Sequence, residues 1–525
     1  MIKNRLEWAI LAAIIAASFL LRLQVMDIPF ERDEGEYAYA AQLLLDGVPP
    51  FKEAYNMKFP GIYAVYAAIL FIFGQTHTGV HLALAFVNGA TSILIFLIGK
   101  RLFGPAAALA ASLAFAMLSF LPSMQGIMAN SEHFVLLAAL AGILALMKAM
   151  DKRSLPMFFL AGALLGLGYT IKQHGAAFVL FGYFLLAPYH FKNSGIKKAF
   201  AGLAAFTIGA TLPFLVMYAL LYSAGVFDRF WFWSFSYAAE YVSVTPFSVG
   251  MKRLGTEASN IFSSAPLLWM IAAIGLFFPL WDKEARRAWP FMAGLLAFSA
   301  LAVLPGFFFR PHYFLFLVPA TALFFGAALK ALPFILGRTK GAAAMTALSI
   351  VLSVYFVYTQ RQALAAPPEV LSRQMYGLNP FPEALVISDF IAKNTAENEK
   401  IAVLGSEPEI YFYSKRKSAT GFIYTYPLME RQRFALDMQK QMMDEVRKAA
   451  PAYLVFVDIK FSWGANDDSA TGIFEWLRAF VAENYTLVGM ADIKATGAKK
   501  YAWGREIENA PAPEPGYGMY VYKRN

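Results

Sequence analysis

The sequence contains no cysteine, and only 15% of its 525 residues are charged. The absence of cysteine excludes disulfides, thiol catalysis and thiolate metal sites. Soluble proteins carry about 25% charged residues, whereas here hydrophobic residues make up 58% of the chain. The shortage of charge therefore argues against an ordinary soluble protein and predicts an α-helical polytopic membrane protein.

The few charges are unevenly distributed along the chain. Residues 1–365 contain 26 Lys and Arg against 15 Asp and Glu, whereas residues 366–525 contain 19 against 20. Excess positive charge in an apolar region is typical of loops at a membrane surface rather than of a nucleic-acid-binding patch. We therefore predict no nucleic-acid partner, a transmembrane domain at residues 1–365, and a second domain at 366–525 that begins with two prolines.

Twelve apolar runs are candidates for membrane spans, each of which needs roughly 20 residues. They cover residues 6–26, 61–74, 79–98, 105–121, 131–147, 157–171, 174–188, 200–222, 262–281, 288–306, 311–329 and 341–359. The run at 61–74 is short and follows a polar segment. The first run has the basic start of a signal peptide but no clear cleavage site, so we expect an uncleaved first helix.

The distribution of basic residues decides whether the run at 61–74 crosses the membrane. If it does not cross, the loops on the N-terminal side carry 16 basic residues and the opposite short loops carry 8. If it crosses, every later loop changes side, and of these 16 basic residues only Lys3 and Arg5 remain on the N-terminal side. Because cytoplasmic loops carry the excess of Lys and Arg, we expect about eleven spans, a cytoplasmic N-terminus and an external C-terminal domain.

The C-terminal segment has the pattern of an α/β domain. The runs KIAVLG (400–405) and AYLVFVD (452–458) predict buried strands, and residues 434–449 and 472–484 predict amphipathic helices. About 160 residues are enough to bury a core of their own. We therefore expect a small α/β domain docked on the external face.

Acidic residues gather in the first outer loop, at residues 27–60. Asp33, Glu34 and Glu36 lie within six residues of Glu31 and predict a short helix on the surface whose N-terminal dipole the acids favour. The simplest interpretation is a solvated helix start. In the second outer loop, Glu132 lies at the border of the hydrocarbon, where an ionisable residue indicates function.

Three separate outer loops each place a cation near the membrane surface. These residues are Lys58, Lys172 and Arg310, and the last two are accompanied by His174 and His312. One such residue is explained by a side chain that extends to the interface. Three of them on the face that carries the acids indicate a phosphate site, and hence transfer from a lipid phosphate.

The longer motifs carry a family resemblance. RDEGEYAYAAQLLLDGVPPFKEAYNMKFPG, MANSEHFVLL, GLGYTIKQ and RPHYFLFLVPA resemble the bacterial glycosyltransferases of the C-type membrane fold (GT-C). More narrowly, the chain resembles the glycosyltransferase family 39-like branch related to protein O-mannosyltransferases and lipid A aminoarabinose transferase. The segment VLGSEPEIYFYSKRKSATGFIY resembles the external domain of many bacterial members. The resemblance implies a polyprenyl-phosphate sugar donor used outside the bacterial inner membrane, and juxtamembrane helices in the first outer loop.

The resemblance also implies roles for individual residues. Asp33 matches the catalytic aspartate and is expected to act as the general base towards the acceptor, with Glu34 orienting or tuning it. Glu132 matches a second acid that positions the acceptor. Lys58 matches the lysine that binds the phosphate leaving group. Lys172, Arg310 and His312 are weaker candidates for phosphate binding.

Several alternatives remain open at this point. A divalent metal is possible at Asp33, Glu34 and Glu36, but Met57 stands where aminoarabinose transferases have an acid, which makes a metal beside Lys58 doubtful. No other cofactor is implied. The acceptor is a lipid, a glycan or a protein. The rival functions are a transporter or flippase of lipid-linked saccharides, for which no repeat or midplane acids are found, and a non-catalytic scaffold.

Overall fold

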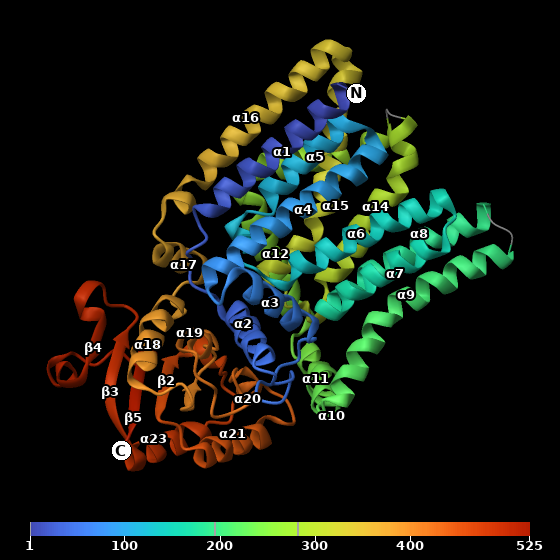
Figure 1. Ribbon diagram of the computed structural model, residues 1–525. Helices are drawn as coiled ribbons and strands as arrows, with labels where there is room; N and C mark the ends of the chain where they lie inside the picture. Colours follow the sequence, from blue (N-terminus) through green and yellow to red (C-terminus); the bar gives the residue numbers. More distant parts are fainter. Residues whose placement is uncertain (1, 194–195, 281–282) are drawn as a thin grey trace.

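The computed structural model describes residues 2–193, 196–280 and 283–525. A tall helical bundle forms one end of the molecule, and a mixed helix-and-strand region forms the other (Figure 1). The N-terminus lies at the end of the bundle that is far from the strands, and α16 (Arg338–Ala365) runs the length of the bundle into the C-terminal region. The predicted end of the ninth span, position 281, lies outside the described residues.

Helices dominate the N-terminal part of the chain. Besides α16, they are α1 (Ile2–Leu23), α2 (Arg32–Leu45), α3 (Gly61–Phe73), α4 (His77–Phe103), α5 (Pro105–Leu118), η1 (Pro122–Met124), α6 (Ser131–Lys152), α7 (Leu155–Ile171), η2 (Gln173–Gly175), α8 (Ala176–Asn193), α9 (Ile196–Ser223), α10 (Phe227–Trp231), η3 (Phe232–Tyr237), α11 (Ala238–Ser243), α12 (Phe247–Ser264), α13 (Pro266–Gly275), η4 (Phe278–Leu280), α14 (Lys283–Val303), η5 (Pro305–Phe307), η6 (Pro311–Leu317) and α15 (Val318–Leu336). Each of the twelve apolar runs of the sequence coincides with at least one of them.

Six described helices are long and apolar enough to cross a membrane. They are Arg5–Leu23, His77–Phe103, Ser131–Lys152, Lys197–Ser223, Pro311–Leu336 and Arg338–Ala365. The pair Phe247–Ser264 and Pro266–Leu280, bent by 102°, is a further candidate, and three apolar helices are shorter. The number of eleven spans therefore stays a prediction from the sequence.

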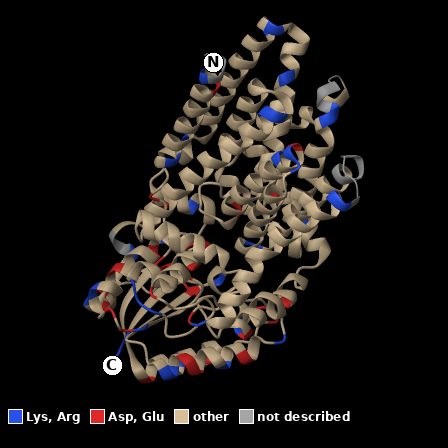
Figure 2. Ribbon diagram, turned by 45° about the vertical axis from the view of Figure 1, so that its right-hand side comes forward, with Lys and Arg blue, Asp and Glu red and all other residues tan. Residues whose placement is uncertain are grey.

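The path of the chain around α3 matches the interpretation that residues 61–74 do not cross. Lys100, near the end of α4, forms an ion pair of 2.5 Å with Glu7 at the start of α1. The rings of Trp8 and Phe96 meet there at 5.5 Å. Helices α1 and α4 are therefore antiparallel neighbours, so α3, with 13 residues, does not carry the chain across the bundle between them. Figure 2 shows Lys and Arg at the helix ends on the N-terminal side of the bundle.

The C-terminal part is an α/β unit, as predicted. Its elements are α17 (Pro368–Tyr376), α18 (Phe381–Asn394), β1 (Ile401–Leu404), α19 (Glu409–Ser414), α20 (Tyr426–Met429), α21 (Ala435–Ala449), β2 (Tyr453–Ile459), α22 (Lys460–Trp463), α23 (Gly472–Asn484), β3 (Tyr485–Asp492), η7 (Gly497–Lys500), β4 (Tyr501–Trp503), η8 (Gly504–Asn509) and β5 (Tyr517–Arg524). The sheet order is β1-β2-β5-β3-β4. Strands β1 and β2 are parallel and the remaining pairs are antiparallel.

The C-terminal unit covers α2, which corrects the expectation of a helix on a wet surface. Gly35 lies so close to α19 that an added Cβ would come within 2.7 Å of the Glu409 backbone nitrogen. The Tyr39 hydroxyl accepts a hydrogen bond of 2.8 Å from the Ser418 backbone N–H. Most of α2 is buried, because the C-terminal unit supplies a second surface that the local sequence does not reveal.

Candidate active site

The acids at the start of α2 point in different directions. The Glu31 carboxylate accepts from the Glu34 backbone N–H, and the Glu34 carboxylate accepts from the Glu31 backbone N–H, which forms a capping box. This arrangement confirms a helix that begins within the acidic cluster. Because a helix turns about 100° per residue, the following acids face different neighbours and take different roles.

Asp33 and Glu36 share the ammonium group of Lys58. The Lys58 Nζ lies 2.8 Å from Asp33 Oδ1 and 2.6 Å from Glu36 Oε2. Tyr63 donates a 2.7 Å hydrogen bond to the other Glu36 oxygen. The Glu36 side chain is fully buried, whereas the Asp33 side chain is 23% exposed. Asp33 is therefore the member of the pair that a substrate can reach.

Charge and burial compete at Asp33. Burial raises the pKa of its carboxyl, but the positive charge of Lys58 and the hydrogen bond from it outweigh burial and hold the pKa well below its usual range. Burial lowers the pKa of Lys58, but Asp33 and Glu36 together raise it above its ordinary value. Asp33 is therefore an anion and Lys58 a cation at neutral pH, the states that a base and a phosphate ligand require.

Glu34 faces the opposite side of the helix, towards the bundle. Its Oε1 lies 2.9 Å from His81 Nε2 and accepts a hydrogen bond of 2.5 Å from the Ala129 backbone N–H. His81 in turn contacts the Met26 carbonyl through Nδ1 at 2.8 Å. Glu34 thus ties three segments together, and its contacts indicate a structural contribution to the placement of Asp33.

We expect Glu34→Ala to destabilise the protein by roughly 3 kcal/mol, because His81 and the Ala129 N–H would be left buried without their acceptor. Thermal unfolding in detergent measures this loss. Asp389→Ala is the control, since it removes an exposed pair with Lys393 that is worth at most about 1 kcal/mol. Equal melting temperatures for the two variants would contradict the structural role of Glu34.

A second charged group lies beside the first. The Glu132 Oε1 accepts a hydrogen bond of 2.5 Å from Lys172 Nζ and lies 3.9 Å from His312 Nε2. His312 Nδ1 contacts Gln125 Oε1 at 2.7 Å. Tyr37 links the two groups, because its ring lies 4.5 Å from the Lys58 Nζ and 5.2 Å from the Tyr66 ring. The Tyr66 hydroxyl in turn donates a hydrogen bond of 2.7 Å to the Ala129 carbonyl, three residues before Glu132. The structure therefore brings Glu132, Lys172 and His312 into the neighbourhood of Asp33.

Arg310 differs from the two lysines. Arg310 is exposed and its guanidinium lies 5.8 Å from the Phe308 ring, but among the described residues it forms no ion pair. Arg310 is followed closely by His312 and Tyr313, whose rings lie 4.9 Å apart, and the Tyr313 ring lies 4.7 Å from the Lys172 Nζ. Phe307 and Phe309, just before it, hold positive φ angles of 52° and 46°, a strained conformation that is common at functional sites. Of Lys58, Lys172 and Arg310, Arg310 is therefore the one whose positive charge is not neutralised by a carboxylate of the described residues and is available to a ligand.

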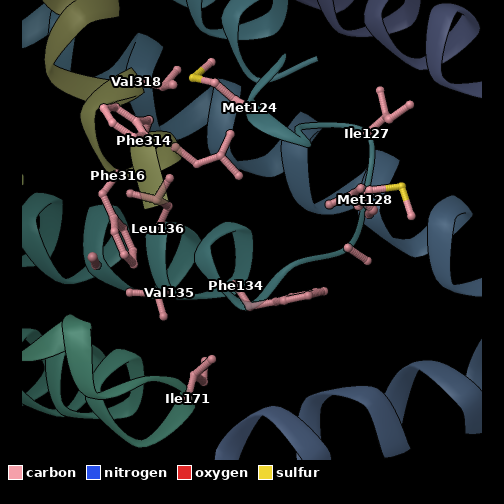
Figure 3. Close-up of a cluster of buried hydrophobic side chains, with 14 of the residues drawn as sticks. Met124, Ile127, Met128, Phe134, Val135, Leu136, Ile171, Phe314, Phe316 and Val318 are labelled. Carbon is pink, nitrogen blue, oxygen red and sulfur yellow. The ribbon is translucent and has the colours of Figure 1, made fainter. Parts of the chain in front are cut away.

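A hydrophobic layer holds these groups in place. Phe134, Val135 and Leu136 of α6 lie near Phe314 and Phe316 of η6 (Figure 3). All five are at least 94% buried. Glu132 and His312 lie on these same two elements, so the packing fixes the distance between the carboxylate and the imidazole.

The residues suggested for a metal do not converge. Asp33 and Glu36 both face Lys58, whereas Glu34 faces His81. In the described part of the chain, no group of three or more His, Asp or Glu side chains is placed to hold a metal ion. The cluster therefore does not fit a divalent ion, and Lys58 occupies the position between the two acids.

Sequence reasoning missed two residues of the site. Glu36 was considered only as a possible metal ligand, and its actual contact with Lys58 was not predicted. Tyr424, from the C-terminal unit, donates a hydrogen bond of 2.9 Å to Asp33 Oδ1. Asp33 and Glu36 are three residues apart, a spacing that places two side chains on the same face of a helix. Their shared contact could therefore have been predicted, whereas nothing in the local sequence indicates Tyr424.

Solved structures share the architecture around this site. ArnT from Cupriavidus metallidurans bound to undecaprenyl phosphate matches with a TM-score of 0.58 and 13% identity, covering 98% of this chain and 97% of ArnT. The archaeal oligosaccharyltransferase AglB from Archaeoglobus fulgidus, in complex with an inhibitory peptide and a dolichol-phosphate, matches with a TM-score of 0.55 and 12% identity, covering 97% and 75%. The chain has the GT-C fold.

The GT-C assignment agrees with a family model and confirms the resemblance that the motifs carried. Residues 57–224 match the model for dolichyl-phosphate-mannose-protein mannosyltransferase. This stretch includes Lys58, Glu132 and Lys172, but neither Asp33 nor Arg310. A comparison with curated proteins gives no match. The fold of the membrane glycosyltransferases is therefore shared over nearly the whole chain, while the sequence match is confined to one third of it.

Proposed function

We propose that the protein is an inverting membrane glycosyltransferase that moves a sugar from a polyprenyl phosphate to an acceptor on the extracytoplasmic face. The observation that carries this proposal is the pair of an ionised, partly exposed Asp33 and Lys58 at 2.8 Å. The pair lies where the helical bundle meets the C-terminal unit. Its two charges suit the two ends of a sugar transfer, namely removal of a proton and departure of a phosphate.

The reaction follows from these two charges. The acceptor hydroxyl or amine gives its proton to Asp33 while its lone pair forms a bond to the anomeric carbon. The bond from that carbon to the phosphate oxygen breaks, and its electron pair leaves with the polyprenyl phosphate. Attack on the face opposite the phosphate inverts the anomeric configuration. A cation beside the departing oxygen stabilises the charge that develops there.

Lys58 and Arg310 are the proposed phosphate ligands. Lys58 is shared between two carboxylates, so a phosphate that binds it takes the place of part of its contact with Asp33. Arg310 brings a planar guanidinium that matches phosphate oxygens in pairs. Lys172 and His312 are paired with Glu132, so we assign this group to positioning the acceptor. Glu34 supports Asp33 through the helix.

A transfer assay tests the proposal. The wild-type protein, in membrane vesicles that contain envelope lipids and glycans, is given a panel of undecaprenyl-phosphate monosaccharides. We expect release of free undecaprenyl phosphate from at least one donor, coupled to a glycosylated product. A protein that is folded by thermal unfolding yet releases no lipid phosphate from any donor contradicts the proposed activity. Movement of intact donor across the vesicle without cleavage favours the flippase.

The predicted location is a bacterial inner membrane, with the N-terminus in the cytoplasm and the C-terminal unit outside. The absence of cysteine makes a clean labelling test possible. Asp467 lies in the C-terminal unit and Lys152 at the opposite end of the bundle, and both are exposed. We expect a membrane-impermeant maleimide to label Asp467→Cys but not Lys152→Cys in intact spheroplasts. The reverse pattern contradicts the topology.

A further inference from the structure

The C-terminal unit reaches into the site through one side chain. Tyr424 donates to Asp33 Oδ1 at 2.9 Å, and Lys58 donates to the same oxygen at 2.8 Å. Among the described residues, no side chain hydrogen-bonds Asp33 Oδ2. The two donors therefore hold one oxygen of the carboxylate and leave the other free. The Tyr424 ring also lies 5.5 Å from the Lys58 Nζ, so the tyrosine contacts both members of the charged pair.

The segment that carries Tyr424 is fixed on both sides. Before it, the Gly421 backbone N–H bonds Glu445 at 2.9 Å, and the Gly421 carbonyl accepts from the Tyr55 N–H at 2.7 Å. After it, the Thr425 backbone N–H bonds Ser406 Oγ at 2.9 Å. Tyr424 itself is 7% exposed. A side chain anchored in this way has little freedom to leave Asp33, so its hydrogen bond is part of the fold.

The neighbour of Asp33 is clamped by the same unit. Arg32 donates to the Ser406 carbonyl at 2.5 Å and to Glu407 Oε1 at 3.0 Å. It also bonds Tyr426 and Asn379. The start of α2 is thus attached to the C-terminal unit at two consecutive residues. The direction of the Asp33 carboxylate depends on Tyr424, which lies 391 residues further along the chain.

We infer that Tyr424 is a positioning residue for the base, so that the C-terminal unit completes the catalytic site instead of only covering it. This inference rests on the proposed function, in which Asp33 is the base. Tyr424 orients the carboxylate so that Oδ2 faces the acceptor, and its hydrogen bond favours the ionised form of Asp33. The tyrosine is not consumed and transfers no proton in the reaction.

The electrostatic part of this role predicts a change in pH dependence. A hydrogen bond to a carboxylate lowers its pKa, so its removal in Tyr424→Phe raises the pKa of Asp33. One hydrogen bond to a charged group corresponds to a shift of about one pH unit. A bound lipid phosphate adds negative charge beside Asp33 and competes for Lys58, which also raises the pKa. The titration of Asp33 is therefore best observed in the lipid-bound protein.

The test measures the affinity of the full-length protein in nanodiscs for undecaprenyl phosphate as a function of pH. A neutral Asp33 repels phosphate less than the anion does, so binding tightens as the pH falls through the pKa of Asp33 in the complex. Titration of the lipid itself is common to all variants. In Tyr424→Phe we expect the tightening to begin about one pH unit higher than in the wild type. Asp33→Asn should lack this component.

The matched control is Tyr39→Phe. Tyr39 lies on the same helix and accepts a hydrogen bond from the C-terminal unit, through Ser418, but does not contact Asp33. It should lose stability like Tyr424→Phe and keep the wild-type pH profile. If the wild type shows the tightening that Asp33→Asn lacks, and Tyr424→Phe shows it at the same pH as the wild type, Tyr424 is not a positioning residue. The proposed function is not affected by that result. If the wild type does not bind undecaprenyl phosphate at any pH, the proposed function itself fails.

Discussion

Asp33→Asn is expected to lower sugar transfer by a factor of about 1,000, since general-base catalysis contributes roughly 100-fold to 10,000-fold. The amide keeps the size of the side chain and a hydrogen-bonding oxygen, but it has no charge with which to take the acceptor proton. Binding of undecaprenyl phosphate at neutral pH should be retained or tightened, because the variant removes a negative charge next to Lys58. Initial rates of lipid phosphate release at saturating donor measure the loss.

The control for this variant is Asp46→Asn, at the other end of α2. Asp46 is exposed and lies 3.6 Å from Lys417, so its replacement should leave the rate unchanged. If Asp33→Asn turns over as fast as Asp46→Asn, Asp33 is not the base. If both variants lose activity together, the effect belongs to the helix and not to the carboxylate.

Lys58→Met is expected to weaken binding of undecaprenyl phosphate by at least about tenfold, which corresponds to 1.4 kcal/mol. The variant removes the cation proposed to contact the phosphate and leaves the repulsion of Asp33 and Glu36. The pKa of Asp33 should rise at the same time, because the positive charge of Lys58 is what holds it down against burial. Activity should therefore fall further at acid pH than at alkaline pH.

Two further variants distinguish the loss of the Lys58 charge from a general loss of folding. Lys58→Arg keeps the charge and should retain more affinity than Lys58→Met. Lys417→Met removes a half-buried lysine that is the partner of Asp46 and should bind the lipid like the wild type. Equal affinity of Lys58→Met and Lys417→Met for undecaprenyl phosphate rules out Lys58 as a phosphate ligand.

Much of the fold was predictable because hydrophobic length and charge position are local properties. The runs at 400–405 and 452–458 became β1 and β2, and 434–449 and 472–484 became α21 and α23 within one residue. The count of basic residues indicated that 61–74 does not cross, and the antiparallel α1 and α4 agree with it. Short apolar helices such as α5, with 14 residues, are harder to assign as spans, since length alone does not decide whether they cross a membrane.

The site was less predictable, because its contacts join distant parts of the chain. The motifs identified Asp33 and Lys58, which the structure places together. They did not show that Lys172 is neutralised by Glu132 while Arg310 forms no ion pair in the described part of the chain. The burial of α2 was also missed, since amphipathicity shows that a helix has a partner and not which one. The contact of Tyr424 with Asp33 was missed for the same reason, because the sequence does not show which distant segment packs against α2.

The most direct test of the account is a structure of the wild-type protein with undecaprenyl phosphate bound. We expect the phosphate to contact Lys58 and Arg310, within reach of an acceptor held at Asp33 Oδ2, and Tyr424 to remain on Oδ1. A phosphate bound at the N-terminal end of the bundle, or one that contacts neither Lys58 nor Arg310, would contradict the account.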